Sequence, residues 1–154
     1  MRFLFLLFPI YIFAHILSIQ INNIKNNKGY IYISIYKNSN NFLDKNKAYK
    51  TIILKSSTNL NYNLDLKSGV YAVSIFHDEN SNGILDRNFF HFPKEGYGFS
   101  TNPFLFGKPT FSDAEFPLKD NQSIIIKMNY WDLISFKIYQ VTLITTKASK
   151  AIVT

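Results

Sequence analysis

One short segment carries oxygen-bearing side chains at the spacing that a hard cation requires. Residues 77–86 read HDENSNGILD, in which Asp78, Asn80 and Asn82 occupy every second position and Asp86 follows a glycine turn. Calcium takes six to eight oxygen ligands in proteins. Alternate side chains of a loop can converge on one such ion when a glycine then allows the chain to bend sharply. The segment therefore predicts a calcium-type loop.

The frame assigns a ligand to each position of the loop. The side chains of Asp78, Asn80 and Asn82 supply oxygens, Ile84 offers its backbone carbonyl, and Asp86 binds directly or through water. Only two of these groups are carboxylates, so we expect a weak site, with a dissociation constant on the order of 10⁻⁴–10⁻³ M. Calcium is the only cofactor that the sequence predicts.

The frame differs from an EF-hand. Its twelfth position is Phe89 rather than a bidentate glutamate, and no amphipathic helices flank it. A further carboxylate could come from Glu95, Asp113 or Glu115, which follow along the chain. The alternative is a plain Asn-Gly turn in a solvated loop. That alternative does not account for the oxygen-bearing residue at every second position.

A second hypothesis gives the same region catalytic chemistry. Two of the carboxylates of Glu95, Asp113 and Glu115 could act as an acid and base pair on a glycan, with His77 as a further base. That reaction depends on a separation that the sequence does not provide. The structural alternative for His77 is a buried hydrogen-bonding role. No serine lies in a nucleophile elbow, and the absence of cysteine excludes thiolate catalysis and disulfides.

Charge and composition limit the partners. The chain has a formal net charge of +7, but its lysines are scattered and form no basic block. This distribution favours a solvated surface over nucleic-acid binding. Because 47% of the residues are hydrophobic, the chain can fill a core and is not disordered by composition.

The N-terminus has the layout of a secretory signal peptide. Arg2 precedes an apolar run, and the small residues Ala14 and Ser18 follow it. We predict residues 1–18 as the signal, with cleavage after Ser18 or alternatively after Ala14. The protein is then secreted or periplasmic. A retained membrane anchor is the other possibility, although the run is short for a spanning helix.

Alternating apolar and polar residues predict an all-β chain. The clearest strand is 30–36, which reads YIYISIY and places three isoleucines on one face. Further strands are predicted at 18–24, 49–54, 60–67, 70–76, 123–130 and 135–145. We expect the first two strands to form a hairpin through the turn at 26–29. Seven strands without helical periodicity indicate an antiparallel sandwich or barrel.

Residues 87–120 form a long irregular segment that is rich in aromatic residues. These aromatic residues are Phe89, Phe90, Phe92, Tyr97, Phe99, Phe104, Phe106, Phe111 and Phe116. They could form a binding platform for a glycan or a partner, or pin the segment onto the sheet as a satellite core. The second interpretation fits the tight turns that Gly and Pro mark in this segment.

Four motifs occur in the order of a known family. They are GVYAV at 69–73, the loop at 77–86, PKEGYGFS at 93–100 and PTFSDA at 109–114. Together they resemble the bacterial domain-of-unknown-function family 2141. The resemblance covers about residues 19–131. It implies an exported immunoglobulin-like or transthyretin-like β-sandwich, and it implies no activity.

These observations converge on one expectation. The chain is an exported, non-catalytic β-sandwich module of the bacterial envelope, stabilised by weak calcium binding, with an envelope protein or a glycan as its partner. Its domain spans residues 19–131, and residues 132–154 are a C-terminal extension that adds one further strand. The alternative is a secreted hydrolase that acts on a glycan through the loop carboxylates.

Overall fold

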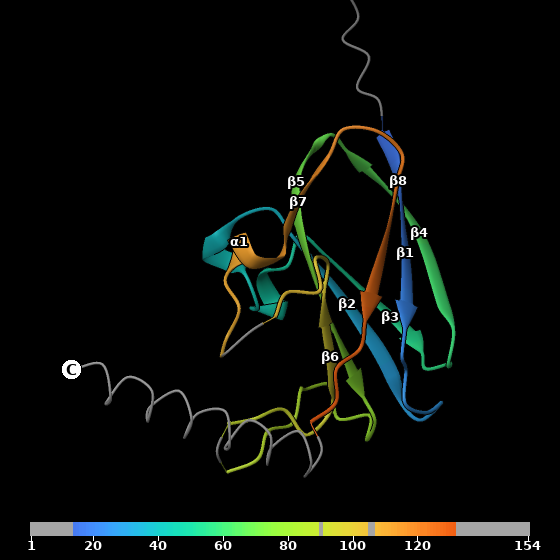
Figure 1. The fold of residues 1–154 in the computed structure, drawn as a ribbon, viewed down its shortest axis with the longest axis vertical. Coiled ribbons are helices and arrows are strands. Elements are labelled where there is room, and N and C mark those ends of the chain that lie inside the picture. The colour runs from blue at the N-terminus through green and yellow to red at the C-terminus, as the bar shows by residue number, and fades with distance from the viewer. Residues whose placement is uncertain (1–13, 90, 105–106, 132–154) are drawn as a thin grey trace, which may run out of the picture.

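The chain folds as two packed β-sheets in a computed structural model that describes residues 14–89, 91–104 and 107–131. The three-stranded sheet has the order β4 (Leu60–Lys67), β1 (Ala14–Asn22), β8 (Gln122–Lys127). The five-stranded sheet contains β3 (Lys50–Lys55), β2 (Tyr30–Tyr36), β5 (Gly69–Asp78) and β6 (Gly96–Phe99), and β7 (Glu115–Leu118) pairs with the start of β5. Figure 1 shows the two layers face to face. The predicted all-β sandwich is confirmed.

The alternation of the strands explains how the layers pack. Ile31, Ile33 and Ile35 of β2 are completely buried, as are Leu17 and Ile21 of β1 on the opposing sheet. Successive side chains of a strand point to opposite faces, so one apolar face of each of these strands meets the other sheet. This apolar layer is the main core.

The other face of the five-stranded sheet is also covered. A second cluster joins Ala72 of β5 and Phe99 of β6 to Ala114. Ala114 belongs to the short helix α1 (Phe111–Ala114). Phe42 and Leu43 pack against the same cluster between the short turns η1 (Ser39–Asn41) and η2 (Lys45–Lys47). Figure 1 shows α1 and this segment on the side of the sheet away from the three-stranded layer.

Two expectations, the hairpin between the first two strands and the irregular course of 87–120, differ from the structure. The strands β1 and β2 do not form a hairpin, because they belong to different sheets and the connection crosses from one layer to the other. The strands are antiparallel except for β1 and β8, which run parallel. The segment 87–120 is not irregular throughout, since it contains β6, α1 and β7.

The ends of the domain bear on the predicted processing. Strand β1 begins at Ala14, within the predicted signal of residues 1–18. The strand predicted at 135–145 and the extension 132–154 lie outside the described residues. Among the residues that the structure describes, no helix has the length and apolar character that a membrane crossing would require.

Candidate functional site

The acidic loop begins where β5 ends. Asp78 is the last residue of β5, and its carboxylate is completely buried. Its Oδ1 atom accepts a hydrogen bond from the backbone N–H of Asn82 at 3.0 Å, and its Oδ2 atom accepts one from Gly83 at 2.8 Å. Gly83 has a φ of 75°, which glycine adopts without the steric cost of a Cβ atom. Asp78 therefore fixes the predicted bend of the loop.

Three more predicted side chains meet inside the loop. The Asn80 amide nitrogen donates to Asp86 Oδ2 at 2.6 Å, and the Asn82 amide nitrogen lies 3.2 Å from both Asp86 oxygens. The Asn82 Oδ1 atom accepts from the backbone N–H of Ile84 at 2.9 Å. The structure thus brings the side chains of Asn80, Asn82 and Asp86 together, with Ile84 in the same turn.

Glu95 joins the two ends of the loop. Its side chain is 5% exposed. Its Oε1 atom accepts from the backbone N–H of Glu79 at 3.0 Å, and its Oε2 atom accepts from the N–H of Asp86 at 3.0 Å. The pairing of Gly96 with His77 brings Glu95 to this position, because it places the residue beside the end of β5.

The donor set can be compared with what calcium requires. Among the described residues, no three His, Asp or Glu side chains are grouped closely enough to hold a metal ion. The amide nitrogens of Asn80 and Asn82 face Asp86, so these amides would have to rotate to present oxygen to a cation between them. Both Asp carboxylates retain acceptor capacity for an ion. The residue types are those of a weak calcium site, but the amide orientations in this structure are not.

A lysine lies beside this loop. The Lys45 ammonium group donates to the backbone carbonyl of Gly83. A positive charge at this position opposes the binding of a divalent cation. It also occupies a carbonyl at the bend, next to the predicted backbone ligand Ile84.

Asp113 lies away from the acidic loop. It is in α1, where its carboxylate accepts hydrogen bonds from the N–H and the hydroxyl of Thr110 at 2.7 and 2.6 Å. These bonds hold the pKa of the Asp113 carboxyl below its usual value. The neighbouring Glu115 pairs with Ala72, six residues before Asp78 on β5. At about 3.3 Å per residue, that places this region roughly 20 Å from the start of the loop.

His77 is buried inside the domain. Its side chain is completely buried, with Nδ1 2.8 Å from the Tyr130 hydroxyl and Nε2 2.7 Å from the Lys28 carbonyl. The carbonyl can only accept, so Nε2 carries a proton and donates to it. Both ring nitrogens are used by structural contacts, and the geometry matches the structural alternative for this residue.

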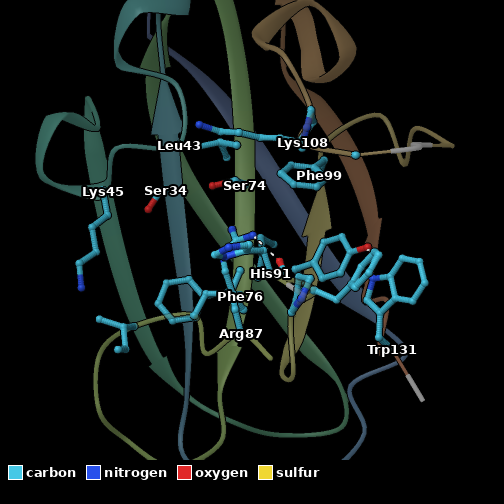
Figure 2. A pocket seen from close by; sticks show the side chains of 18 of the residues that line it. Ser34, Leu43, Lys45, Ser74, Phe76, Arg87, His91, Phe99, Lys108 and Trp131 are labelled. Atoms are coloured by element: carbon cyan, nitrogen blue, oxygen red, sulfur yellow. Dashed lines mark hydrogen bonds between the residues drawn. The ribbon is translucent and has the colours of Figure 1, made fainter. Parts of the chain in front are cut away.

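The sequence did not predict a cavity on the outer face of the five-stranded sheet (Figure 2). Ser34 of β2 and Ser74 of β5 are paired in register at its floor. Aromatic side chains surround them, including Phe76, Tyr97 and Phe99. The signal that could have indicated this cavity is Ser34, a small residue on a face of β2 that otherwise carries tyrosines.

The aromatic residues of the segment 87–120 lie in three kinds of surroundings. Phe99 and Phe116 are buried and belong to the two core clusters. Phe89 and Phe104 have exposed rings, at 92% and 86%. Phe92 lines the cavity. Phe90 and Phe106 lie outside the described residues. The satellite core therefore accounts for only part of this group.

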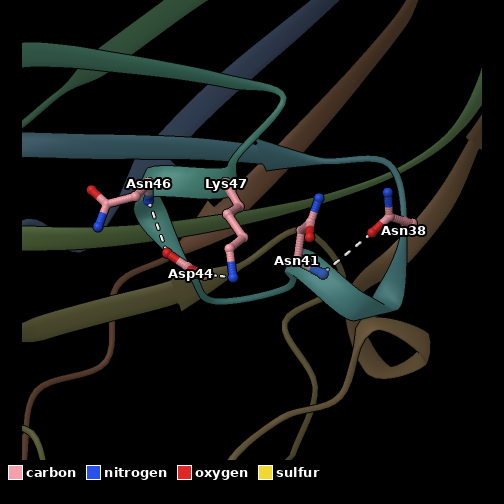
Figure 3. Close-up of polar contacts among 5 residues, drawn as sticks. All are labelled: Asn38, Asn41, Asp44, Asn46 and Lys47. Carbon is pink, nitrogen blue, oxygen red and sulfur yellow. Dashed lines mark hydrogen bonds and ion pairs between the residues drawn. The ribbon is translucent and has the colours of Figure 1, made fainter.

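Hydrogen bonds hold the segment that borders the cavity near Leu43. Asn38 caps η1 by accepting from the Asn41 N–H at 3.2 Å, and Asp44 caps η2 by accepting from the Asn46 N–H at 3.1 Å (Figure 3). Lys47 forms an ion pair with Asp44 at 3.2 Å. This pair is exposed, so we assign it little stabilising energy. The two caps fix the position of the turn.

Fold and loop together define a class of protein. It is a two-sheet β-sandwich in which a central strand leads into an acidic loop, and a buried glutamate closes that loop.

The chain belongs to the domain-of-unknown-function family 2141, described as uncharacterized proteins conserved in bacteria. The family model matches residues 19–126, which is more than two thirds of the chain. No curated protein and no solved structure shows significant similarity to it.

Proposed function

We propose that the chain is an exported, non-catalytic module of the bacterial envelope whose acidic loop binds calcium weakly and which binds a further ligand or partner. One observation carries the calcium proposal. The side chains of Asn80, Asn82 and Asp86 converge within a bend that Asp78 fixes. A cation would replace the amide–carboxylate hydrogen bonds of the loop with stronger ion–oxygen contacts.

The groups suggested for catalysis favour a structural role. Glu95 and His77 are buried and hydrogen-bonded within the fold, and Asp113 lies along β5 from the loop. A general base must reach the proton that it removes. This arrangement supports a binding or structural module over the hydrolase.

The apolar segment after Arg2 supports export. An exported domain without disulfides depends on its core and on bound ions for stability. With about 1 mM calcium and a dissociation constant of about 10⁻⁴ M, binding adds about 1.4 kcal/mol to the free energy of unfolding. The bound ion then links the end of β5 to the loop that follows it.

A thermal melt tests the calcium site. We expect 1 mM calcium to raise the melting temperature of the purified chain by about 5 °C relative to chelator. Asp86→Asn removes a carboxylate while keeping the side chain's size, and should abolish most of this shift. Asp65→Asn is the matched control, because it removes one charge from an exposed position of β4. The same melting temperature with calcium and with chelator in the unaltered chain would contradict the proposal.

A further inference from the structure

The cavity on the outer face of the five-stranded sheet has a volume of about 570 Å³. Small-molecule sites commonly have volumes of about 300–1,000 Å³. Three residues with hydroxyl groups, Ser34, Ser74 and Tyr36, line its floor. The floor thus offers a compact polar group at the centre of the sheet.

The walls are apolar and held in place. Phe76 stacks on Tyr32 with ring centroids 4.6 Å apart. The Trp131 ring nitrogen donates to the Tyr97 hydroxyl at 2.8 Å, and Phe92 lies 5.0 Å from the Trp131 ring. Aromatic walls that are fixed by contacts with one another lose little side-chain freedom when an apolar molecule enters.

The charge around the cavity has one sign. Among the residues that the structure describes, Lys45, Arg87 and Lys108 line it, and no aspartate or glutamate does. Figure 2 shows Lys45 apart from the other two, Lys108 across the upper part of the view and the Arg87 guanidinium near its middle. Lys45 donates to the carbonyl of Gly83, and the Arg87 guanidinium donates to the carbonyl of His91 at 3.0 Å. Because these acceptors are neutral, the positive charges are not cancelled.

Two acidic residues close to lining residues are engaged in contacts of their own. The negative charge of Asp44 contributes to raising the pKa of the Tyr36 hydroxyl. Its carboxylate is paired with the Lys47 ammonium group at 3.2 Å. Asp86 precedes Arg87 in the chain, but its carboxylate accepts from Asn80 and Asn82 inside the loop. The cavity therefore combines an aromatic interior with a cationic rim.

We propose that this cavity binds a small amphipathic anion, with an aromatic or aliphatic body between the aromatic walls and an acidic group at Arg87 and Lys108. The site deepens the proposed function by naming the ligand class of the module, and it does not depend on calcium being bound. The shared chemistry is an apolar body with one anionic end, and either a carboxylate or a phosphate satisfies it.

Charge disfavours the alternative occupants. Residues 132–154 follow directly from the wall residue Trp131, but they contain three lysines and one aspartate. A second copy of this chain carries a formal charge of +7. A cationic rim repels both, whereas it attracts an anion. A neutral glycan does not use the rim charges.

Two fluorescent probes of similar size separate charge from apolar contact. Anilinonaphthalene sulfonate carries an aromatic body and a negative charge, and N-phenylnaphthylamine is its neutral counterpart. We expect saturable sulfonate binding to the full chain that weakens about fivefold in Arg87→Gln and in Lys108→Gln. The neutral probe should bind equally to all of these proteins. Lys119→Gln is the matched control, since Lys119 is an exposed lysine that does not line the cavity.

A filling substitution tests the location of the site. Ser74→Leu places a larger side chain on the cavity floor, and it should abolish binding of both probes while near-ultraviolet circular dichroism remains native. If that variant fails to fold, the two rim variants, whose positions are exposed, still decide the question. Displacement of the sulfonate probe by decanoate or by decyl phosphate then distinguishes a carboxylate ligand from a phosphate one.

Three results would overturn the proposal. Sulfonate affinity that is unchanged in both rim variants would remove the role of the cationic residues. Complete absence of probe binding would indicate that the chain's own residues fill the cavity. Affinity that falls as the protein concentration rises would indicate that a second copy covers it. Each probe titration is repeated with calcium and with chelator, so a failure of the calcium site is recorded separately.

Discussion

The Glu95 carboxylate connects the two ends of the acidic loop through its two oxygen atoms. It accepts the backbone N–H groups of Glu79 and Asp86, each at 3.0 Å, in a nearly water-free position. Hydrogen bonds that involve a buried charged group contribute more than neutral ones, and an unpaired buried N–H is costly. Glu95 thus holds the loop whether or not a cation is bound.

Glu95→Gln provides a direct measurement of this contribution. The substitution replaces one oxygen with an NH₂ group, which cannot accept from a backbone N–H. We expect a loss of about 2 kcal/mol in the free energy of unfolding, measured from urea denaturation curves. Glu115→Gln, at an exposed position of β7, should change stability by less than about 0.5 kcal/mol. Equal losses in the two variants would show that the Glu95 bonds add nothing specific.

Local spacing explains which site residues the sequence could indicate. The alternation of Asp78, Asn80 and Asn82 is a property of one short segment, so the convergence of these side chains was accessible from the sequence. The placement of Asp113 was not, because it depends on β7 pairing with the start of β5 rather than its end. Glu95 and Asp113 look equivalent in the sequence until that register is known.

The same distinction applies to whole elements. The strands β2 and β4 have the predicted bounds, because their alternating residues face a core on one side. The hairpin between the first two strands was wrong because a turn signal does not reveal whether its flanking strands share a sheet. Here Asn23 has a φ of 65° and its side chain donates to the Met128 carbonyl at 2.8 Å. These features occur where the chain leaves β1 and crosses from the three-stranded sheet to the five-stranded sheet.

Strand β6 was missed because its inward positions are glycines. A Cβ atom on Gly98 would lie 2.7 Å from Ile126 Cγ2 and 2.9 Å from the Lys127 carbonyl oxygen, both in β8. Close approach between the sheets therefore requires glycine at this position. Glycine removes the alternating apolar pattern from which a strand is recognised, so the periodicity fails where the packing is tightest.

Strand β1 makes a prediction about signal cleavage. Its first residues contribute to the fold, since the His15 ring is hydrogen-bonded to the Ser68 hydroxyl at 2.8 Å and Leu17 is completely buried. Cleavage after Ser18 would remove these contacts, whereas cleavage after Ala14 would keep them. We therefore expect the exported protein to begin at His15. Mass spectrometry of the protein recovered from the periplasm or the medium measures its N-terminus, and a mature chain that begins at Ile19 would contradict this prediction.

In the molecule as a whole, the two faces of the five-stranded sheet have different roles. The inner face of the five-stranded sheet forms the main core with the three-stranded sheet. Its outer face carries the cavity, and the acidic loop continues from the strand at its centre. Ile84 and Leu85 of the loop also line the cavity. An ion that orders the loop would therefore also order one wall of the proposed ligand site.

Three tyrosines couple the stability of the whole domain to alkaline pH. Burial raises the pKa of the Tyr36, Tyr97 and Tyr130 hydroxyls above the ordinary value of 10.0. A pKa that is higher in the folded state than in the unfolded state means that folding favours the neutral hydroxyl. The resulting stability is fully present below pH 10 and is lost as the pH rises through the folded-state values.

We therefore expect the urea midpoint of unfolding to fall above pH 10. Tyrosine ionisation can be followed by absorbance at 295 nm. Part of it should occur only as the near-ultraviolet circular dichroism of the folded state is lost. The absorbance distinguishes tyrosines from lysines that lose charge in the same range. Tyr130→Phe removes the hydroxyl that His77 contacts, and should lower stability at pH 7 while making the alkaline loss less steep. Tyrosine ionisation that is complete before any folded signal is lost would contradict the coupling, because the buried hydroxyls would then ionise within the intact sandwich.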